Sequence, residues 1–169
     1  MPPPKSEAFL LFNLNRMKIL MVCLGNICRS PIAEGILRYK ANEYGLSIET
    51  DSAGTSNYHI GNPPDPRMIL TASKNGIDIS DLRARQFVAA DFDRFDLIYA
   101  MDQSNYENML LLAKTEEDRS KVKLILNEVH PTSNDEVPDP YFGGDQGFQH
   151  VIDLLNVAVD KLIVNHGLR

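Results

Sequence analysis

The strongest constraint on the fold is a short, unbroken apolar run that leads directly into a loop and then into a helix. Residues 18–22 read KILMV, which is typical of a strand covered on both faces, as in a parallel sheet. The loop contains Gly25 and Asn26, residues that permit tight turns, and it ends in Ser30 and Pro31. Serine is a common helix cap and proline a common first helical residue, so we predict a helix capped by Ser30 that runs to about Tyr44.

The same alternation of strand and helix patterns continues along the chain. Further strands are expected at 46–52, 95–101 and 122–126. Further helices are expected at 66–74, capped by Asp65, from Asp102 or Ser104 onward, and at about 146–165, where apolar residues recur at three- and four-residue steps. This order predicts an α/β three-layer sandwich, with helices on both faces of a four-stranded, parallel, twisted sheet of the flavodoxin or Rossmann type. Ligands of such sheets bind beyond the carboxyl ends of the strands, where the Cys23 loop lies.

Length and composition limit the organisation and the partners. A chain of 169 residues indicates one domain, predicted at 17–169, with 1–16 as an N-terminal arm or a misplaced start before Met17. A net charge of -6 argues against a nucleic-acid binder. No apolar run approaches the ~18 residues of a membrane span. Two cysteines are too few for a secreted disulfide framework, so we expect a cytoplasmic protein.

The loop combines residues suited to binding and attacking phosphate. Its backbone N–H groups are expected to form an anion-binding nest, strengthened by the positive end of the following helix. Arg29 can bind two phosphate oxygens at once, and Ser30 can donate a hydrogen bond to sulfur. In that field Cys23 is expected to be a thiolate, placed to form a cysteinyl-phosphate intermediate. The four histidines, His59, His130, His150 and His166, show no ligand spacing and are expected to be surface or structural residues. Neither a metal nor another cofactor is expected.

Residues 22–31, VCLGNICRSP, resemble the signature of the low-molecular-weight protein tyrosine phosphatases. The resemblance extends from residue 17 to about 165. Its further matches are Asp51 to Thr55, Gly61, Asp65-Pro66-Arg67, Ala84-Arg85-Gln86, Met101-Asp102, Ser104-Asn105 and Asp139-Pro140-Tyr141.

This resemblance implies a phosphotyrosine hydrolase with Cys23 as nucleophile, Arg29 as phosphate ligand and Asp139 as general acid and later base. Asn26 would hold the loop in shape, and Ser30 would stabilise the thiolate. Residues that would bind phosphate or support the loop are Leu24, Gly25, Asn26, Ile27, Cys28 and Ser30. The substrate slot would have Leu24 and Tyr141 as walls, with Tyr58 near its mouth. Cys28 would pair with an oxidised Cys23.

The expected partner is a phosphotyrosine-containing protein or a small aryl phosphate, with no nucleic acid and no membrane, and the chain is expected to be a monomer or weak dimer. One departure from the family is Leu82, where a histidine often bonds the loop asparagine. Asn26 then needs another partner, such as Ser104 or a backbone group.

Two alternatives stay open at this point. Arsenate reductase would use the same loop, but its self-contained form needs further cysteines to relay electrons, and none follows Cys28. A non-catalytic phosphotyrosine-binding module would also use the loop, although it would not need both Cys23 and Asp139.

Overall fold

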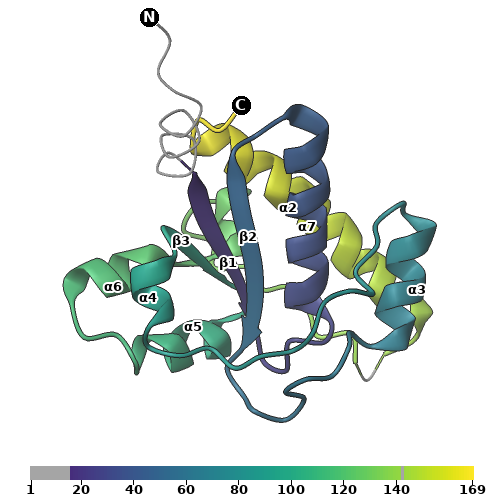
Figure 1. Ribbon diagram of the computed structural model, residues 1–169, viewed down its shortest axis with the longest axis horizontal. Coiled ribbons are helices and arrows are strands. Elements are labelled where there is room, and N and C mark those ends of the chain that lie inside the picture. Colours follow the sequence, from purple (N-terminus) through teal and green to yellow (C-terminus); the bar gives the residue numbers. More distant parts are fainter. Residues whose placement is uncertain (1–15, 142) are drawn as a thin grey trace, which may run out of the picture.

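The computed structural model describes residues 16–141 and 143–169. A parallel sheet of four strands, in the order β2-β1-β3-β4, forms its middle layer (Figure 1). The strands are β1 (Met17–Cys23), β2 (Ile48–Gly54), β3 (Leu97–Ala100) and β4 (Val122–Leu124). The predicted sheet is therefore confirmed, whereas the expected arm at 1–16 falls, apart from Arg16, outside the described residues.

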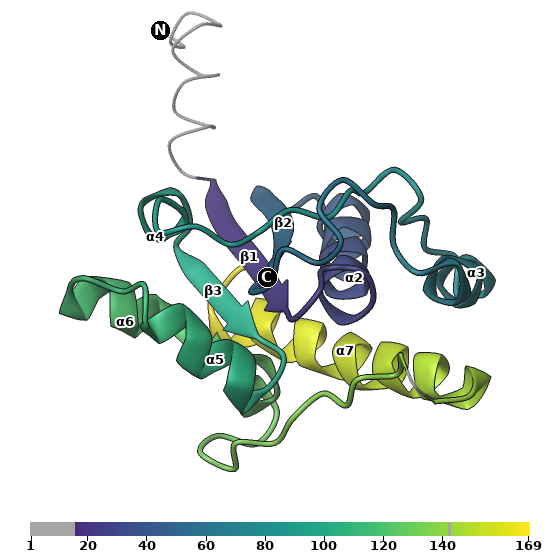
Figure 2. The ribbon, with the colours of Figure 1, turned by 90° about the horizontal axis from the view of Figure 1, so that it is seen from below.

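Helices cover both faces of this sheet, as Figures 1 and 2 show. One face carries α2 (Arg29–Tyr44), α7 (Asp145–Asn165) and, beyond them, α3 (Pro66–Lys74). The other face carries α4 (Asp91–Arg94), α5 (Gln103–Leu110) and α6 (Glu116–Lys121). A 3-10 turn, η1 (Ile125–Glu128), follows β4 and contacts α7. The structure is the three-layer α/β sandwich that the strand and helix order predicts.

The central strand β1 explains why its sequence is apolar throughout. Its side chains alternate between two cores, because successive residues of a strand point to opposite faces. Ile19 and Met21 pack with α2 and α7, and Leu20 and Val22 pack with the aromatic residues on the other face; all four are fully buried. With both faces covered, no position of β1 from Ile19 to Val22 is left for a polar side chain.

The structure corrects the predicted start of α2. The helix begins at Arg29 and not at Pro31, and its cap is Cys28, without a side-chain hydrogen bond. The Ser30 hydroxyl, predicted to cap the helix, instead lies by the Cys23 sulfur and the Ala53 carbonyl. By contrast, Asp65 caps α3 and Asp102 caps α5, as expected. The α2 amides that a cap would occupy thus stay available to another ligand.

Three short elements were not predicted. Helices α4 and α6 and the turn η1 contain four to six residues each, too few to show an apolar period. In α6 no residue is buried, and its sequence is almost entirely charged. Local interactions rather than packing stabilise α6: the Thr115 hydroxyl accepts from the Asp118 N–H, and acidic residues occupy the first turn.

The end of β2 fits so closely against the Cys23 loop that only glycine is accommodated. A Cβ atom on Gly54 would lie 2.7 Å from the Leu24 carbonyl oxygen and 3.2 Å from the Asn26 nitrogen, both backbone atoms. Close approach of two backbones is a common reason for glycine in a strand. The loop shape therefore depends on a residue about thirty positions away in the sequence.

We predict that Gly54→Ala lowers the free energy of unfolding by about 1–3 kcal/mol, because the loop must move to relieve the overlap. Urea denaturation followed by circular dichroism measures this change. Gly147→Ala in α7 is the matched control, since its Cβ would meet only ordinary contacts at 3.6 Å and alanine favours a helix. Equal stability of Gly54→Ala and the unsubstituted protein would contradict the predicted overlap.

Candidate active site

The Cys23 sulfur lies at the end of β1, beneath the loop that leads to α2. Its Sγ accepts a hydrogen bond from the backbone N–H of Asn26 at 3.3 Å and lies 3.0 Å from the Ser30 Oγ. Asn26 has a positive φ of 56°, a conformation that asparagine tolerates better than most residues. The loop thus turns back over the sulfur, as the Gly-Asn pair in the sequence predicts.

The carbonyl groups of this loop point away from the sulfur. Those of Cys23, Leu24 and Ile27 accept hydrogen bonds from the backbone N–H groups of Thr55, Ser56 and Asp65, at 2.8–2.9 Å. Within residues 16–141 and 143–169, no protein group accepts from the N–H groups of residues 24, 25, 27 and 28. Amides arranged in this way, next to the N-terminus of a helix, are suited to bind an anion.

The Asn26 side chain fastens the loop from inside. Its Nδ2 donates to Ser30 Oγ at 2.8 Å and to Ser52 Oγ at 2.9 Å, and its Oδ1 accepts from the Arg85 backbone N–H at 3.0 Å. The expectation of a backbone partner is confirmed, while Ser104 is exposed and is not a partner. Leu82 stands at the position of the family histidine, but its side chain packs against the apolar core.

Arg29 is buried and aligned by acidic groups. Its Nη1 donates to Asp102 Oδ2 at 2.7 Å and to the Val137 carbonyl at 3.1 Å, and its Nη2 lies 3.8 Å from Asp139 Oδ2. Because Asp102 also caps α5, the guanidinium is tied to the carboxyl end of β3. The sequence indicated Asp102 as a possible start of α5 and as part of a matching motif, but it gave no sign that Asp102 binds Arg29.

Asp139 overhangs the loop from the segment before α7. Its Oδ1 accepts from the Tyr141 backbone N–H at 3.0 Å, and its side chain is 39% exposed. Arg67, at the start of α3, donates to the Tyr141 carbonyl at 2.9 Å and lies over the Tyr141 ring. The sequence assigned no role to Arg67, although it stands in the matching Asp65-Pro66-Arg67 motif.

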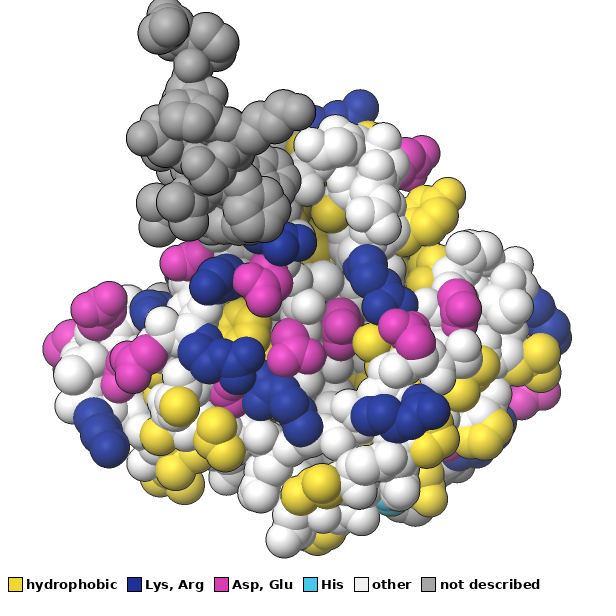
Figure 3. All heavy atoms as spheres, viewed as in Figure 1, with side chains coloured by type: hydrophobic (Ala, Val, Ile, Leu, Met, Phe, Trp, Pro, Cys, Tyr) yellow, Lys and Arg dark blue, Asp and Glu magenta, His cyan; other side chains and the backbone are white. Residues whose placement is uncertain are grey.

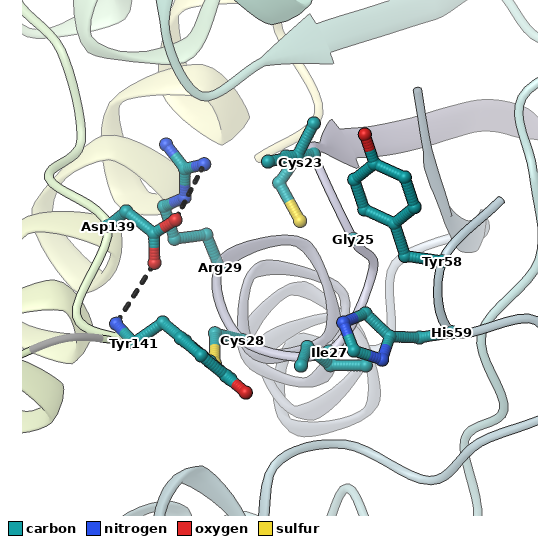
Figure 4. A pocket seen from close by; sticks show the side chains of 10 residues that line it. Cys23, Gly25, Ile27, Cys28, Arg29, Tyr58, His59, Asp139 and Tyr141 are labelled. Carbon is teal, nitrogen blue, oxygen red and sulfur yellow. Dashed lines mark hydrogen bonds and ion pairs between the residues drawn. The ribbon is translucent and has the colours of Figure 1, made fainter. Parts of the chain in front are cut away.

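These groups surround one pocket of about 220 Å³ (Figure 4). The Cys23 sulfur points into it, with Arg29 and Asp139 on one side and Tyr58 and His59 on the other. The other lining residues are Leu24, Gly25, Ile27, Cys28 and Tyr141. The structure therefore brings together the predicted catalytic residues and the predicted slot residues.

Two residues of the 54–66 loop line this pocket. Tyr58 is 72% exposed and lies at the mouth of the pocket, near which it was expected. His59, which the sequence suggested was a surface or structural residue, is half-buried and forms part of the pocket wall. The turn-rich composition of 54–66 indicated a functional loop but could not indicate which of its side chains faces the pocket.

Both cysteines are free thiols, but their surroundings differ. Burial raises the pKa of the Cys28 thiol far above its ordinary value, and the nearby Asp65, Cys23 and Asp139 raise it further. Cys28 is therefore protonated at neutral pH, and a protonated thiol is a weak nucleophile. The described part of the chain contains no His, Cys, Asp and Glu cluster that could hold a metal ion.

The surface carries both acidic and basic side chains, in agreement with the modest net charge of -6. On the face that Figure 3 shows, basic and acidic side chains are interspersed. Ion pairs at the surface include Arg38–Asp81. Among residues 16–141 and 143–169 no helix is long and apolar enough to cross a membrane. This face thus lacks the broad basic surface that nucleic-acid binding requires.

Comparison with known proteins gives consistent matches. The family model of the low molecular weight phosphotyrosine protein phosphatases matches residues 18–168. A Synechocystis protein that carries the same family name is 49% identical over 153 residues, covering 89% of this chain and 97% of that protein.

Two solved structures are also similar. A protein tyrosine phosphatase from Entamoeba histolytica, with Hepes in its active site, has a TM-score of 0.83 at 40% identity; the match covers 89% of this chain and 97% of that one. A Drosophila arginine phosphatase has a TM-score of 0.83 at 30% identity, covering 89% and 98%. The match to the family model over nearly the whole chain, together with these relatives, shows that the chain belongs to the low molecular weight phosphotyrosine protein phosphatase family and is an enzyme of that class.

Proposed function

We propose that this enzyme hydrolyses phosphotyrosine, in proteins and in small aryl phosphates, through a covalent phosphate on Cys23. The observation that carries the proposal is the position of the Cys23 sulfur at the floor of a loop of free amides, with Arg29 and Asp139 beside it. A phosphate held by these amides and by the Arg29 guanidinium would lie directly above the sulfur. Ser30 and the Asn26 N–H would stabilise the thiolate.

The reaction would proceed in two steps. In the first, Cys23 Sγ attacks phosphorus, the bond between phosphorus and the phenolic oxygen breaks, and Asp139 gives its proton to the departing oxygen. In the second, Asp139 takes a proton from water, the water oxygen attacks phosphorus, and the sulfur–phosphorus bond breaks to release inorganic phosphate. Arg29 and the loop amides would hold the equatorial oxygens during both steps.

The substrate slot follows from the residues above the loop. Leu24 and Tyr141, about two-fifths exposed, would enclose the aromatic ring, and Tyr58 would contact it at the mouth. Gly25, Ile27 and Cys28 would supply N–H groups or shape the loop. Such a slot places the phosphate of an aryl ester at the sulfur, whereas a phosphoserine side chain is too short to reach it.

Cys28 is proposed as the redox partner of Cys23. Peroxide would oxidise the Cys23 thiolate to a sulfenic acid; the Cys28 sulfur would then attack that sulfur and release water, forming a reversible disulfide. Both side chains line the same pocket. The raised pKa of the Cys28 thiol makes it a weak nucleophile, and oxidation of Cys23 removes one of the charges that raise this pKa.

The proposal also covers the domain organisation, the cofactor requirement, the oligomeric state and the compartment. Residues 17–169 would form the single catalytic domain, acting without metal or cofactor as a monomer or weak dimer in the cytoplasm. Free thiols at both cysteines fit a reducing compartment. The two alternatives, an arsenate reductase and a non-catalytic binding module, are separated from this proposal by turnover measurements.

We predict that the protein hydrolyses p-nitrophenyl phosphate without added metal, with vanadate as a competitive inhibitor, and that Cys23→Ser abolishes turnover. The reason is that a serine hydroxyl is not ionised at neutral pH and cannot replace the thiolate. Absorbance of released p-nitrophenol, with and without chelator, measures this. A requirement for a divalent metal, or turnover by Cys23→Ser, would rule out the mechanism; substrate binding without any turnover would favour the binding module.

We predict that Asp139→Ala slows the hydrolysis of phenyl phosphate by about 10²–10⁴-fold, and that of p-nitrophenyl phosphate much less. A nitrophenolate leaves without a proton, whereas a phenolate needs one. Steady-state kcat for both substrates, with Asp135→Ala as a control from the same segment, gives the comparison. Equal losses on the two substrates would remove Asp139 from the role of acid.

We predict that phosphotyrosine peptides are hydrolysed and matched phosphoserine peptides are not, because of the depth of the slot. Release of inorganic phosphate is the measurement. Phosphoarginine belongs in the same panel, since one similar structure is that of an arginine phosphatase. Preference for either of these over phosphotyrosine would replace the proposed substrate class.

A further inference from the structure

One buried carboxyl group lies outside the residues assigned so far. Glu34, in α2 one turn after Ser30, is only 5% exposed. Its Oε1 accepts a hydrogen bond from the Ser52 hydroxyl at 2.7 Å, and in the described chain this is its only hydrogen-bond partner. Among the described residues it forms no ion pair, so burial of its charged form is costly.

The hydrogen bonds from Glu34 to the sulfur have a defined direction. The Arg85 backbone N–H can only donate, so the Asn26 Oδ1 faces it and the Asn26 Nδ2 faces Ser30 and Ser52. Each serine oxygen thus accepts a hydrogen bond from Asn26. Each serine hydroxyl must therefore donate its own hydrogen bond to a different acceptor. The Ser52 hydroxyl donates its hydrogen bond to Glu34, which leaves the Ser52 oxygen free to accept from Asn26.

The other branch of the network ends at the catalytic sulfur. The Ser30 oxygen accepts from Asn26, so its proton points either to Cys23 Sγ at 3.0 Å or to the Ala53 carbonyl at 3.3 Å. The sulfur is closer, and as a thiolate it is the charged acceptor. The side chains of Glu34, Ser52, Asn26 and Ser30 therefore form one chain that ends in a donor aimed at the sulfur.

Building on the proposed function, we propose that Glu34 is a positioning residue of this enzyme: as the terminal acceptor, it holds Ser52 and Asn26 so that the Ser30 hydroxyl donates to the Cys23 thiolate. Without an acceptor at residue 34, the Ser52 proton has no partner in the buried network. Ser52 would then rotate, Asn26 would lose one of its three bonds, and the loop would hold Ser30 and the sulfur less firmly.

The test compares Glu34→Leu, which keeps the volume but removes the acceptor, with Glu34→Gln, whose amide oxygen can still accept from Ser52. We expect Glu34→Leu to lower kcat on p-nitrophenyl phosphate by roughly tenfold and Glu34→Gln by less than threefold, as for one buried hydrogen bond. Glu43→Leu, an exposed glutamate on the same helix, is the matched control and should not change kcat. Circular dichroism confirms that each variant is folded.

A second readout reports on the sulfur directly. Iodoacetate reacts with the thiolate, and the pH of half-maximal inactivation should rise in Glu34→Leu because the sulfur loses a donor. This readout does not require turnover, so it tests the inference even if the proposed hydrolysis fails. An unchanged inactivation profile and an unchanged kcat in Glu34→Leu would overturn the inference while leaving the proposed function intact.

The route through Ser52 is tested by a double-mutant cycle. If Glu34 acts through Ser52, then Glu34→Leu should lower kcat by less than twofold when Ser52→Ala is already present. A full tenfold loss in that background would show that Glu34 acts by packing or by another path, and would overturn the positioning role.

Burial also raises the pKa of Glu34 to about 7, although the Ser52 hydrogen bond opposes this. The charged groups around it are Asp51 on β2 and Asp81 after α3, which raise the pKa further, and Arg38 on α2, which lowers it. Arg38 itself is bonded to Asp81, and Arg85 to Asp51. The carboxyl group thus changes its charge near neutral pH.

A raised pKa in the folded state has a defined effect on stability. Glu34 contributes stability that is fully present below its unfolded pKa, near 4.5, and is lost as the pH rises through about 7. We therefore predict that, between pH 5 and pH 8, the melting temperature falls more in the unsubstituted protein than in Glu34→Gln. Parallel profiles for the two proteins would contradict a titrating Glu34.

Discussion

The side-chain amide of Asn26 is the interaction on which the rest of the site depends. It joins three segments that are distant in sequence: α2 through Ser30, the end of β2 through Ser52, and the segment after α3 through Arg85. These bonds hold Asn26 at positive φ, and that turn directs the loop amides inward while the loop carbonyls bond outward. If these bonds were absent and the loop became extended, its amides would no longer converge on an anion, and the Asn26 N–H would no longer contact the sulfur.

The balance of charge is the second constraint. Arg29 is a buried cation, and a buried charge is tolerated only with partners. Asp102 supplies a close one at 2.7 Å and Asp139 a looser one at 3.8 Å. Asp102, the close partner, fixes the guanidinium of Arg29. Asp139, the more distant partner, is a partly exposed carboxyl group next to the pocket. The same electrostatic arrangement thus suits the proposed binding of a phosphate dianion and the proposed role of Asp139 in proton transfer.

The residues that the sequence predicted best are those whose role is local. The apolar run 18–22, the Asp65 cap and the apolar spacing of α7 each depend on a few neighbouring residues, and all were confirmed. The predicted Ser30 cap was wrong because its hydroxyl is drawn to Cys23 and Asn26, and Asn26 is itself held by residues far along the chain. His59, Arg67 and Glu34 were not assigned to the site, since which side chain of a loop or helix faces a pocket depends on how the loop or helix packs.

Three features can be read from the amino-acid order alone: the class of fold, the position of the loop at the end of the first strand, and the candidate pair Cys23 and Arg29. These follow from periodicity and from spacing within nine consecutive residues, 23–31. The packed structure was needed to show how Asp139 reaches that loop, which groups bond Asn26 in the absence of the family histidine, and that a buried Glu34 ends the chain of hydrogen bonds behind the sulfur. Those contacts join strands and helices that are far apart in sequence, and parallel strands bring their carboxyl ends together only when the whole sheet has formed.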